Sequence, residues 1–204
     1  MKNSTGTLGV LLFAVAFGFS LAATPIWAST INTLPKDGDL ATAGSLSQGG
    51  TFLADDINLA GFTINIGMTV ERRARPILLG TTSTGEPTMG PVLWEGPDVV
   101  TPFNGDVTFT PNVPLTPGEL YFLGLDYGFF TSVDGDIIIL SARSDNPITD
   151  GRAWRLLSTG WDSFSPNVDI GARIVMNSVP VHPPKCSQNL TCTGDFTIDG
   201  IDTT

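Results

Sequence analysis

Short apolar runs broken by turn residues are the feature that most constrains the fold of this chain. Phe62, Ile64 and Ile66 share one side of an extended segment, and Thr63 and Asn65 point to the other side. This period of two residues is typical of a half-buried β-strand. No window after the N-terminal segment shows the spacing of three and four residues that an amphipathic helix requires. The pattern therefore predicts an all-β protein.

Comparable runs recur at the spacing that is usual for antiparallel strands. We expect strands at residues 50–53, 57–66, 75–80, 92–95, 106–110, 119–126, 137–140, 152–157 and 168–176. A single sheet of this kind would leave one apolar face in water, so two sheets must pack face to face. We therefore predict an antiparallel two-sheet β-sandwich with jelly-roll-like topology, and an immunoglobulin-like topology is the alternative.

The N-terminal segment predicts export. Lys2 precedes an almost wholly apolar stretch at residues 8–21, and small residues follow as far as Ala28. A charged start, an apolar core and a small-residue exit are the parts of a secretory signal peptide. The apolar run is shorter than the roughly 20 residues that cross a bilayer. We expect residues 1–28 to be a signal peptide cleaved after Ala28, or after Ala23, with no membrane span in the secreted protein.

The charge balance limits the partners of the remaining chain, in which we assign residues 29–179 to the sandwich. The sequence holds 20 acidic and 10 basic residues, a formal net charge of −10. Such a surface repels the phosphates of nucleic acid and of anionic lipid. The expected partners are therefore polysaccharide and other cell-surface or matrix components.

Side chains that could support catalysis are scarce. The one histidine, His182, lies in a proline-rich stretch, whereas serine and cysteine hydrolases need a positioned imidazole. A glycosidase needs two carboxyl groups about 5 to 9 Å apart, and the sequence brings no two acids together among Glu71, Glu95, Glu119 and Asp126. We therefore predict that the protein is not an enzyme.

Aromatic residues near turns predict a binding surface. Trp161 follows a glycine turn, and Tyr127 and Phe130 come after a strand. Flat rings on a sandwich can stack on sugar rings while nearby polar groups bind the hydroxyls. The alternative is that these rings fill the core, which we expect of Trp154 because it lies within a strand. The candidate ligand-binding residues are Trp161, Phe130 and Tyr127.

The chain changes character after residue 179. Three prolines remove backbone donors and stiffen residues 180–194, which we assign as a linker. Cys186 and Cys192 lie in it, and in an exported protein such a close pair predicts a disulfide. A closed zinc site is the alternative, but two cysteines and His182 are too few ligands for one.

Residues 195–204 predict part of a calcium loop. Asp195, Thr197 and Asp199 offer side-chain oxygens at loop positions 1, 3 and 5, and Gly200 falls at position 6, where a sharp turn is needed. Ile201 follows and offers its carbonyl. The expected cofactor is therefore Ca²⁺ at a partial loop, because position 12 lies beyond the sequence, and an unstructured acidic tail is the alternative.

Several stretches together resemble a bacterial secreted β-sandwich domain. They are Ser144-Asp145-Asn146-Pro147, Gly151-Arg152-Ala153, Thr159-Gly160-Trp161 and Asp169-Ile170-Gly171-Ala172-Arg173, with residues 91–95 and 115–121 of the same type. The resemblance covers residues 45–178 and is to domains of exported proteins of the PEP-CTERM type, while residues 195–204 resemble the opening of a dockerin repeat. It implies an extracellular location and a chain that continues past Thr204.

These features predict a secreted, non-catalytic β-sandwich module for surface or matrix interaction, with carbohydrate as the candidate ligand. The alternative is an accessory domain of a secreted hydrolase whose catalytic part is absent from this chain.

Overall fold

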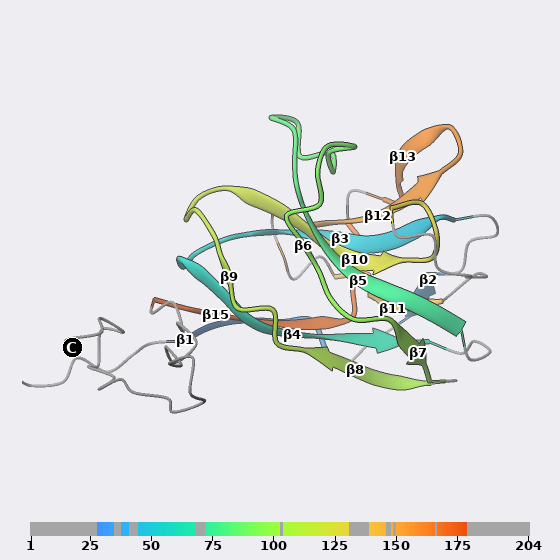
Figure 1. Ribbon diagram of the computed structural model, residues 1–204, viewed down its shortest axis with the longest axis horizontal. Helices are drawn as coiled ribbons and strands as arrows, with labels where there is room; N and C mark the ends of the chain where they lie inside the picture. The colour runs from blue at the N-terminus through green and yellow to red at the C-terminus, as the bar shows by residue number, and fades with distance from the viewer. Residues whose placement is uncertain are drawn as a thin grey trace, which may run out of the picture.

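The computed structural model describes residues 28–34, 38–40, 45–67, 72–102, 104–130, 139–145, 148, 150–165 and 167–178. Within these ranges the regular elements are all β-strands, and they form two layers packed face to face (Figure 1). No helix among the described residues is long and apolar enough to span a membrane. The prediction of an antiparallel two-sheet β-sandwich is confirmed.

The first layer, sheet A, has eight strands, and their order is β1-β15-β4-β11-β14. Strands β8 and β9 also pair with β4, and β2 pairs with β11. The strands are β1 (Ala28–Asn32), β2 (Gly38–Leu40), β4 (Asn58–Ile66), β8 (Gly105–Phe109), β9 (Val113–Pro114), β11 (Leu140–Arg143), β14 (Asp169–Ile170) and β15 (Ala172–Asn177).

The second layer, sheet B, has seven strands in the order β13-β12-β3-β10-β5-β6, and β7 pairs with β5. The strands are β3 (Ser47–Leu53), β5 (Arg72–Gly80), β6 (Trp94–Glu95), β7 (Val99–Thr101), β10 (Leu120–Asp126), β12 (Arg152–Leu157) and β13 (Gly160–Ser163). All named pairs in both sheets are antiparallel, including the central register in which Leu123 of β10 faces Gly50 of β3 and Leu78 of β5.

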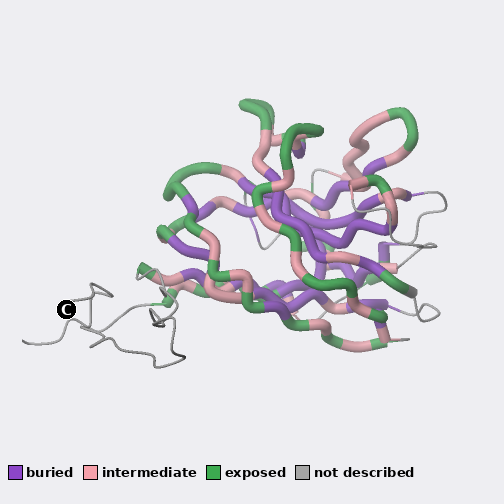
Figure 2. Tube along the Cα trace, viewed as in Figure 1, coloured by how far each residue is buried: buried purple, intermediate pink, exposed green. Residues whose placement is uncertain are grey.

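Alternation along the strands builds the core between the layers (Figure 2). Phe62, Ile64 and Ile66 of β4 are at most 1% exposed, as their spacing predicts. Leu123 and Leu125 of β10 enter the same core from the other sheet. Each large apolar side chain buried in this way stabilises the fold by about 1.5 to 3 kcal/mol.

The strand predictions differ from the structure at several strand ends and at the short strands. The predicted strand 92–95 is β6 at Trp94–Glu95 only, and β3 and β5 each begin three residues before the predicted position. Residues 168–176 form two strands, β14 and β15, because the strand is interrupted at Gly171. A Cβ atom added at Gly171 would lie 3.0 Å from the Ser141 Cβ atom. The predicted strand 137–140 has only its last two residues in the described part, where β11 begins at Leu140. The short strands β1, β2, β7, β9 and β13 carry too few alternating residues for the pattern to predict them.

Both terminal segments fall outside the described residues. The predicted signal peptide lies there except for its last residue, Ala28, with which β1 begins. The expected disulfide partners and calcium ligands lie outside as well; they are Cys186, Cys192, Asp195, Thr197, Asp199 and Ile201. These assignments stay predictions.

Candidate functional site

The outward face of sheet B carries a second apolar cluster, separate from the core between the sheets. Four buried side chains form it, and three partly buried ones pack against them. We call this set the outer cluster; its members are Ile77, Leu79, Phe122, Trp154, Val92, Phe130 and Trp161. The outward face of a sandwich has no partner sheet, so its apolar side chains are covered by nearby loops and turns.

A glycine floor lets the ring of Phe122 lie close to the sheet. A Cβ atom added at Gly49 would fall 2.6 Å from the Phe122 Cζ atom, and one added at Gly124 would fall 2.7 Å from it. The ring therefore occupies the space that two side chains would otherwise fill. The Trp161 ring packs on the Phe122 ring at 4.8 Å between centroids, tilted by 59°.

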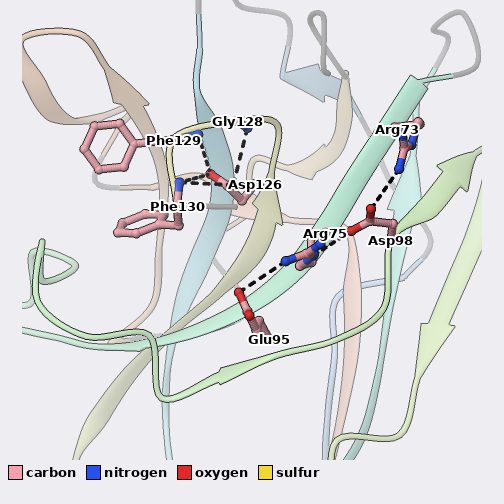
Figure 3. Close-up of polar contacts among 8 residues, drawn as sticks. All are labelled: Arg73, Arg75, Glu95, Asp98, Asp126, Gly128, Phe129 and Phe130. Carbon is pink, nitrogen blue, oxygen red and sulfur yellow. Dashed lines mark hydrogen bonds and ion pairs between the residues drawn. The ribbon is translucent and has the colours of Figure 1, made fainter. Parts of the chain in front are cut away.

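Asp126 fixes the turn that brings Phe130 to the outer cluster (Figure 3). Its buried carboxylate accepts hydrogen bonds from the backbone N–H groups of Gly128 at 3.3 Å, Phe129 at 3.2 Å and Phe130 at 3.2 Å. The Ser47 hydroxyl donates a further bond at 2.5 Å. The turn holds Phe130 against the cluster and leaves Phe129 42% exposed.

Ion pairs hold the chain at the edge of sheet B. The Arg75 guanidinium lies 2.5 Å from Asp98 and 3.6 Å from Glu95, and Arg73 lies 2.9 Å from Asp98 (Figure 3). The hydrogen bond from Arg75, assisted by its charge, lowers the pKa of Asp98 and raises that of Arg75. These pairs tie residues 94–98 to β5 at the base of the segment that rises from sheet B between β5 and β6 (Figure 1).

The tip of that segment is a closed turn. The Thr82 N–H donates to the Glu86 carbonyl at 2.8 Å, and the Gly85 N–H donates to the Thr82 carbonyl at 2.9 Å. Gly85 has a φ of +81°, a conformation that glycine adopts without strain. The turn therefore holds Thr84 and Gly85 in a defined position that faces the neighbouring strand.

A cavity of about 250 Å³ lies between this tip and the beginning of β12. Its walls come from the tip, from the outward faces of β3, β10 and β12, and from the residues before β12; they are Thr51, Thr84, Gly85, Leu120, Asp150, Gly151, Arg152 and Trp154. Hydroxyl, carboxyl and guanidinium groups thus surround one aromatic ring, and that ring also belongs to the outer cluster. The cavity and the cluster form one continuous surface on sheet B.

Arg152 has no carboxylate partner among the residues that the structure describes. Its Cζ atom lies 5.6 Å from the centroid of the Trp154 ring, a cation–π distance. Four other arginines of the described ranges each pair with a carboxylate; they are Arg73, Arg75, Arg143 and Arg155. The guanidinium donors of Arg152 are therefore available in the cavity.

The residues that the sequence predicts for ligand binding separate in the structure. Trp161 and Phe130 lie together in the outer cluster. Tyr127 does not join them, because it is 4% exposed and its hydroxyl donates to the Gln48 Oε1 atom at 3.1 Å. Burial, and then the charge of Asp126, raises the pKa of Tyr127 well above its usual value. This corrects the expectation for Tyr127, whose ring fills the core and cannot stack on a ligand.

The sequence analysis missed the cavity but contained a signal for part of it. Arg152 and Trp154 are two residues apart in a predicted strand, so they must share a face. Trp154 is buried, as expected, but on the outward side of sheet B rather than in the main core. Thr84 and Asp150 lie far apart in the sequence, and only the fold brings them together.

A buried carboxyl group lies elsewhere, in β14. Asp169 is 1% exposed, and its Oδ2 atom accepts a hydrogen bond from the Ile148 N–H at 2.9 Å. Its Oδ1 atom has no hydrogen-bond partner within the described ranges. Burial raises the pKa of Asp169, and the charge of Asp145 adds to this effect. No group of three or more His, Cys, Asp or Glu side chains within the described ranges is placed to hold a metal ion.

Comparison with known proteins gives likeness in structure alone. No family model matches the chain, and no curated protein matches it. The clostridial cysteine protease Cwp84 after propeptide cleavage superposes with a TM-score of 0.55 and 10% identity, over 74% of this chain and 40% of that chain. The structure of the cysteine protease and lectin-like domains of Cwp84, a surface layer associated protein of Clostridium difficile, superposes with a TM-score of 0.48 and 12% identity. That superposition covers 69% of this chain and 33% of the other.

This chain therefore spans less than half the length of the solved chains that it resembles. At 10% identity the first likeness shows that the two proteins share a β-sandwich fold.

Proposed function

We propose that this protein is a non-catalytic extracellular module that binds carbohydrate through the outward face of sheet B and so attaches to a surface or matrix. The observation that carries the proposal is the cavity of about 250 Å³ in which Arg152, Asp150 and two threonines surround Trp154. A pocket for a small ligand combines apolar walls with a few converging polar groups. The cavity itself is lined mainly by polar atoms, which match the hydroxyls of a sugar, and the outer cluster beside it supplies the apolar surface that matches the face of a sugar ring.

The outer cluster extends this surface beyond the cavity. Trp161 and Phe130 are partly exposed there, and the glycine floor beneath Phe122 keeps the aromatic surface close to the sheet. Aromatic faces contribute binding through apolar contact while they keep a defined orientation. We propose that successive units of a polysaccharide pass from the cavity across these rings.

Binding without turnover is part of the proposal. Asp126, one of the acids that a glycosidase might have used, instead accepts hydrogen bonds from Ser47 and from three backbone amides. Its carboxylate therefore has a structural role in the turn. We expect bound polysaccharide to be recovered without shortening.

A glycan array followed by polysaccharide pull-down with the secreted protein tests the function. Trp161→Ala should weaken binding about fivefold or more, because stacking by one aromatic ring contributes about 1 kcal/mol or more. Trp94→Ala is the matched control, since Trp94 packs edge-on against the core residue Phe62, away from the outer cluster. Equal binding by the two variants, or no glycan bound by the unmodified protein, contradicts the proposal.

A second candidate is an accessory domain of a secreted hydrolase. It is supported by the likeness to a cysteine protease of which this chain covers 40%, because a sandwich of this kind there forms part of a longer chain. The DNA downstream of Thr204 tests this alternative. A stop codon at that point would remove a catalytic part that follows the sandwich.

A further inference from the structure

We infer that the cavity beside Arg152 selects a neutral sugar unit with adjacent hydroxyl groups, and that Arg152 and Asp150 determine this specificity. The inference rests on the proposed function and names its ligand class. Both side chains line the same cavity, one from the first residue of β12 and the other from just before it.

Arg152 supplies hydrogen-bond donors. Its guanidinium contacts the ring of Trp154 and makes no ion pair or side-chain hydrogen bond with any other part of the described chain. A guanidinium has five N–H donors in a planar fork. Contact with the Trp154 ring restricts the side chain, so the donors that remain point to solvent or to a bound acceptor.

Asp150 supplies an acceptor on the same rim. Its carboxylate is exposed and forms no hydrogen bond or ion pair among the residues that the structure describes. An ionised carboxylate only accepts hydrogen bonds, and a hydroxyl both donates and accepts. Two neighbouring hydroxyls can therefore satisfy both residues, one accepting from Arg152 and the other donating to Asp150.

A carboxylate-bearing sugar fits this arrangement less well. It would pair with Arg152 but would also lie beside Asp150, and like charges in close contact repel. The net charge of −10 on the chain opposes the approach of an anionic polymer as well. A neutral ligand meets neither obstacle.

The size of the cavity indicates one sugar ring. Its volume of about 250 Å³ lies just below the 300–1,000 Å³ that is usual for sites of drug-sized ligands. Thr51 and Thr84 also line this space. The Thr51 hydroxyl donates to the Arg152 carbonyl at 3.4 Å, and the Thr84 hydroxyl bonds to the Thr82 hydroxyl at 2.8 Å, so each oxygen keeps capacity to accept a further hydrogen bond. The remaining units of a polymer would then lie outside the cavity.

Calorimetric titration of the secreted protein tests the inference, with laminarin, xylan and galactomannan as neutral probes and polygalacturonate as the acidic probe. Arg152→Ala should weaken binding of the neutral polymer about tenfold, because hydrogen bonds from a charged donor are lost. Arg152→Lys should recover only part of the affinity, since an ammonium lacks the planar fork. Arg173→Ala is the matched control, because Arg173 is exposed on the outward side of sheet A between the buried Ala172 and Ile174.

Asp150→Asn separates the two ligand classes by the sign of its effect. It should weaken binding of a neutral sugar, because a charged acceptor is replaced by a neutral one, and it would strengthen binding of an acidic sugar. Affinity for the neutral probe should change little between low and high salt.

Three outcomes overturn the inference. Binding of polygalacturonate alone, tighter binding of the neutral polymer by Asp150→Asn, or equal losses in Arg152→Ala and Arg173→Ala each refute the assigned specificity. A loss of binding in Trp161→Ala would leave the proposed function standing. Absence of binding to every probe refutes both.

Discussion

The turn after β10 offers the sharpest test of how this structure is held together. Replacing Asp126 by alanine removes the acceptor for three backbone N–H groups and for the Ser47 hydroxyl. Ser47 is fully buried, so water cannot replace the lost acceptor there. Gly128 and Phe130 are partly exposed, and water can hydrate their amides once the turn opens.

The expected loss of stability follows from the buried environment of the Ser47 hydroxyl and the partly exposed environment of the turn amides. A buried hydroxyl left without its partner costs about 1 to 3 kcal/mol. Each of the three longer amide bonds contributes about 0.5 to 1.5 kcal/mol net. We expect Asp126→Ala to lower the free energy of unfolding by about 2.5 to 7.5 kcal/mol, the sum of these contributions. Asp126→Asn should cost less, because its amide oxygen can still accept from Ser47.

Urea unfolding followed by tryptophan fluorescence measures this effect. Glu119→Ala is the control, because Glu119 is an exposed acid directly before the same strand. Substitutions of this kind usually change stability by less than about 0.5 kcal/mol. Ser47→Ala and the double variant complete a double-mutant cycle. The two losses of stability should not add, because both substitutions remove the same hydrogen bond between Ser47 and Asp126. Equal stability of Asp126→Ala and Glu119→Ala, or strict additivity in the cycle, would refute the role assigned to Asp126.

Three further predictions concern the glycine floor, the buried carboxyl and the C-terminal segment. Gly124→Ala should destabilise the protein by about 1 to 3 kcal/mol, because the new Cβ would lie 2.3 Å from the Gln48 carbonyl oxygen. Gly38→Ala is the control, since no atom of the described residues lies within 4 Å of its Cβ position, and equal denaturation midpoints of the two variants would contradict the prediction. Burial raises the folded-state pKa of Asp169 above its ordinary value of 3.8, so its contribution to stability falls as pH rises through that range; melting temperatures from pH 4 to 7 should shift in favour of Asp169→Asn, and a constant difference argues against it. Calorimetry with Ca²⁺ on residues 180–204, extended to the natural C-terminus, should show binding, and its absence removes the calcium loop.

How far the sequence predicts the fold depends on the range of the interactions. Period-two alternation identified the strands that carry the core, such as the one containing Phe62 and Ile64, because burial on one face leaves its mark in local sequence. It could not identify β13, in which all four residues are partly exposed. It also placed Trp154 correctly as buried but could not say which face of the sheet covers it. When a sheet carries apolar residues on both faces, alternation in the sequence does not show which of the two faces a given side chain joins.

The misplacement of Tyr127 has a related cause. Its position directly after a strand suggested an exposed ring, yet the turn that Asp126 organises reverses the chain within four residues and returns Phe130 to the outward face. Tyr127 is thereby left on the inner side, where Gln48 accepts from its hydroxyl. A carboxylate that binds the backbone amides following it decides which of the three aromatic residues Tyr127, Phe129 and Phe130 can contact a ligand, and a count of aromatic residues does not contain that information.

The position of the candidate site also depends on contacts between residues that are far apart in the sequence. The strands of sheet B would leave apolar side chains in water on their outward face. In the described part of the chain, Val92 of the 81–93 segment, Phe130 of the turn after β10 and Trp161 of the β12–β13 hairpin pack over that face, and the segment and the hairpin rise above it (Figure 1). The tip of the 81–93 segment lies near the beginning of β12, at the end of that strand opposite the hairpin, and the cavity lies there between Thr84 and Arg152. The side chains that cover the apolar outward face thus leave one part of it open, and the pocket that remains is lined mainly by polar groups.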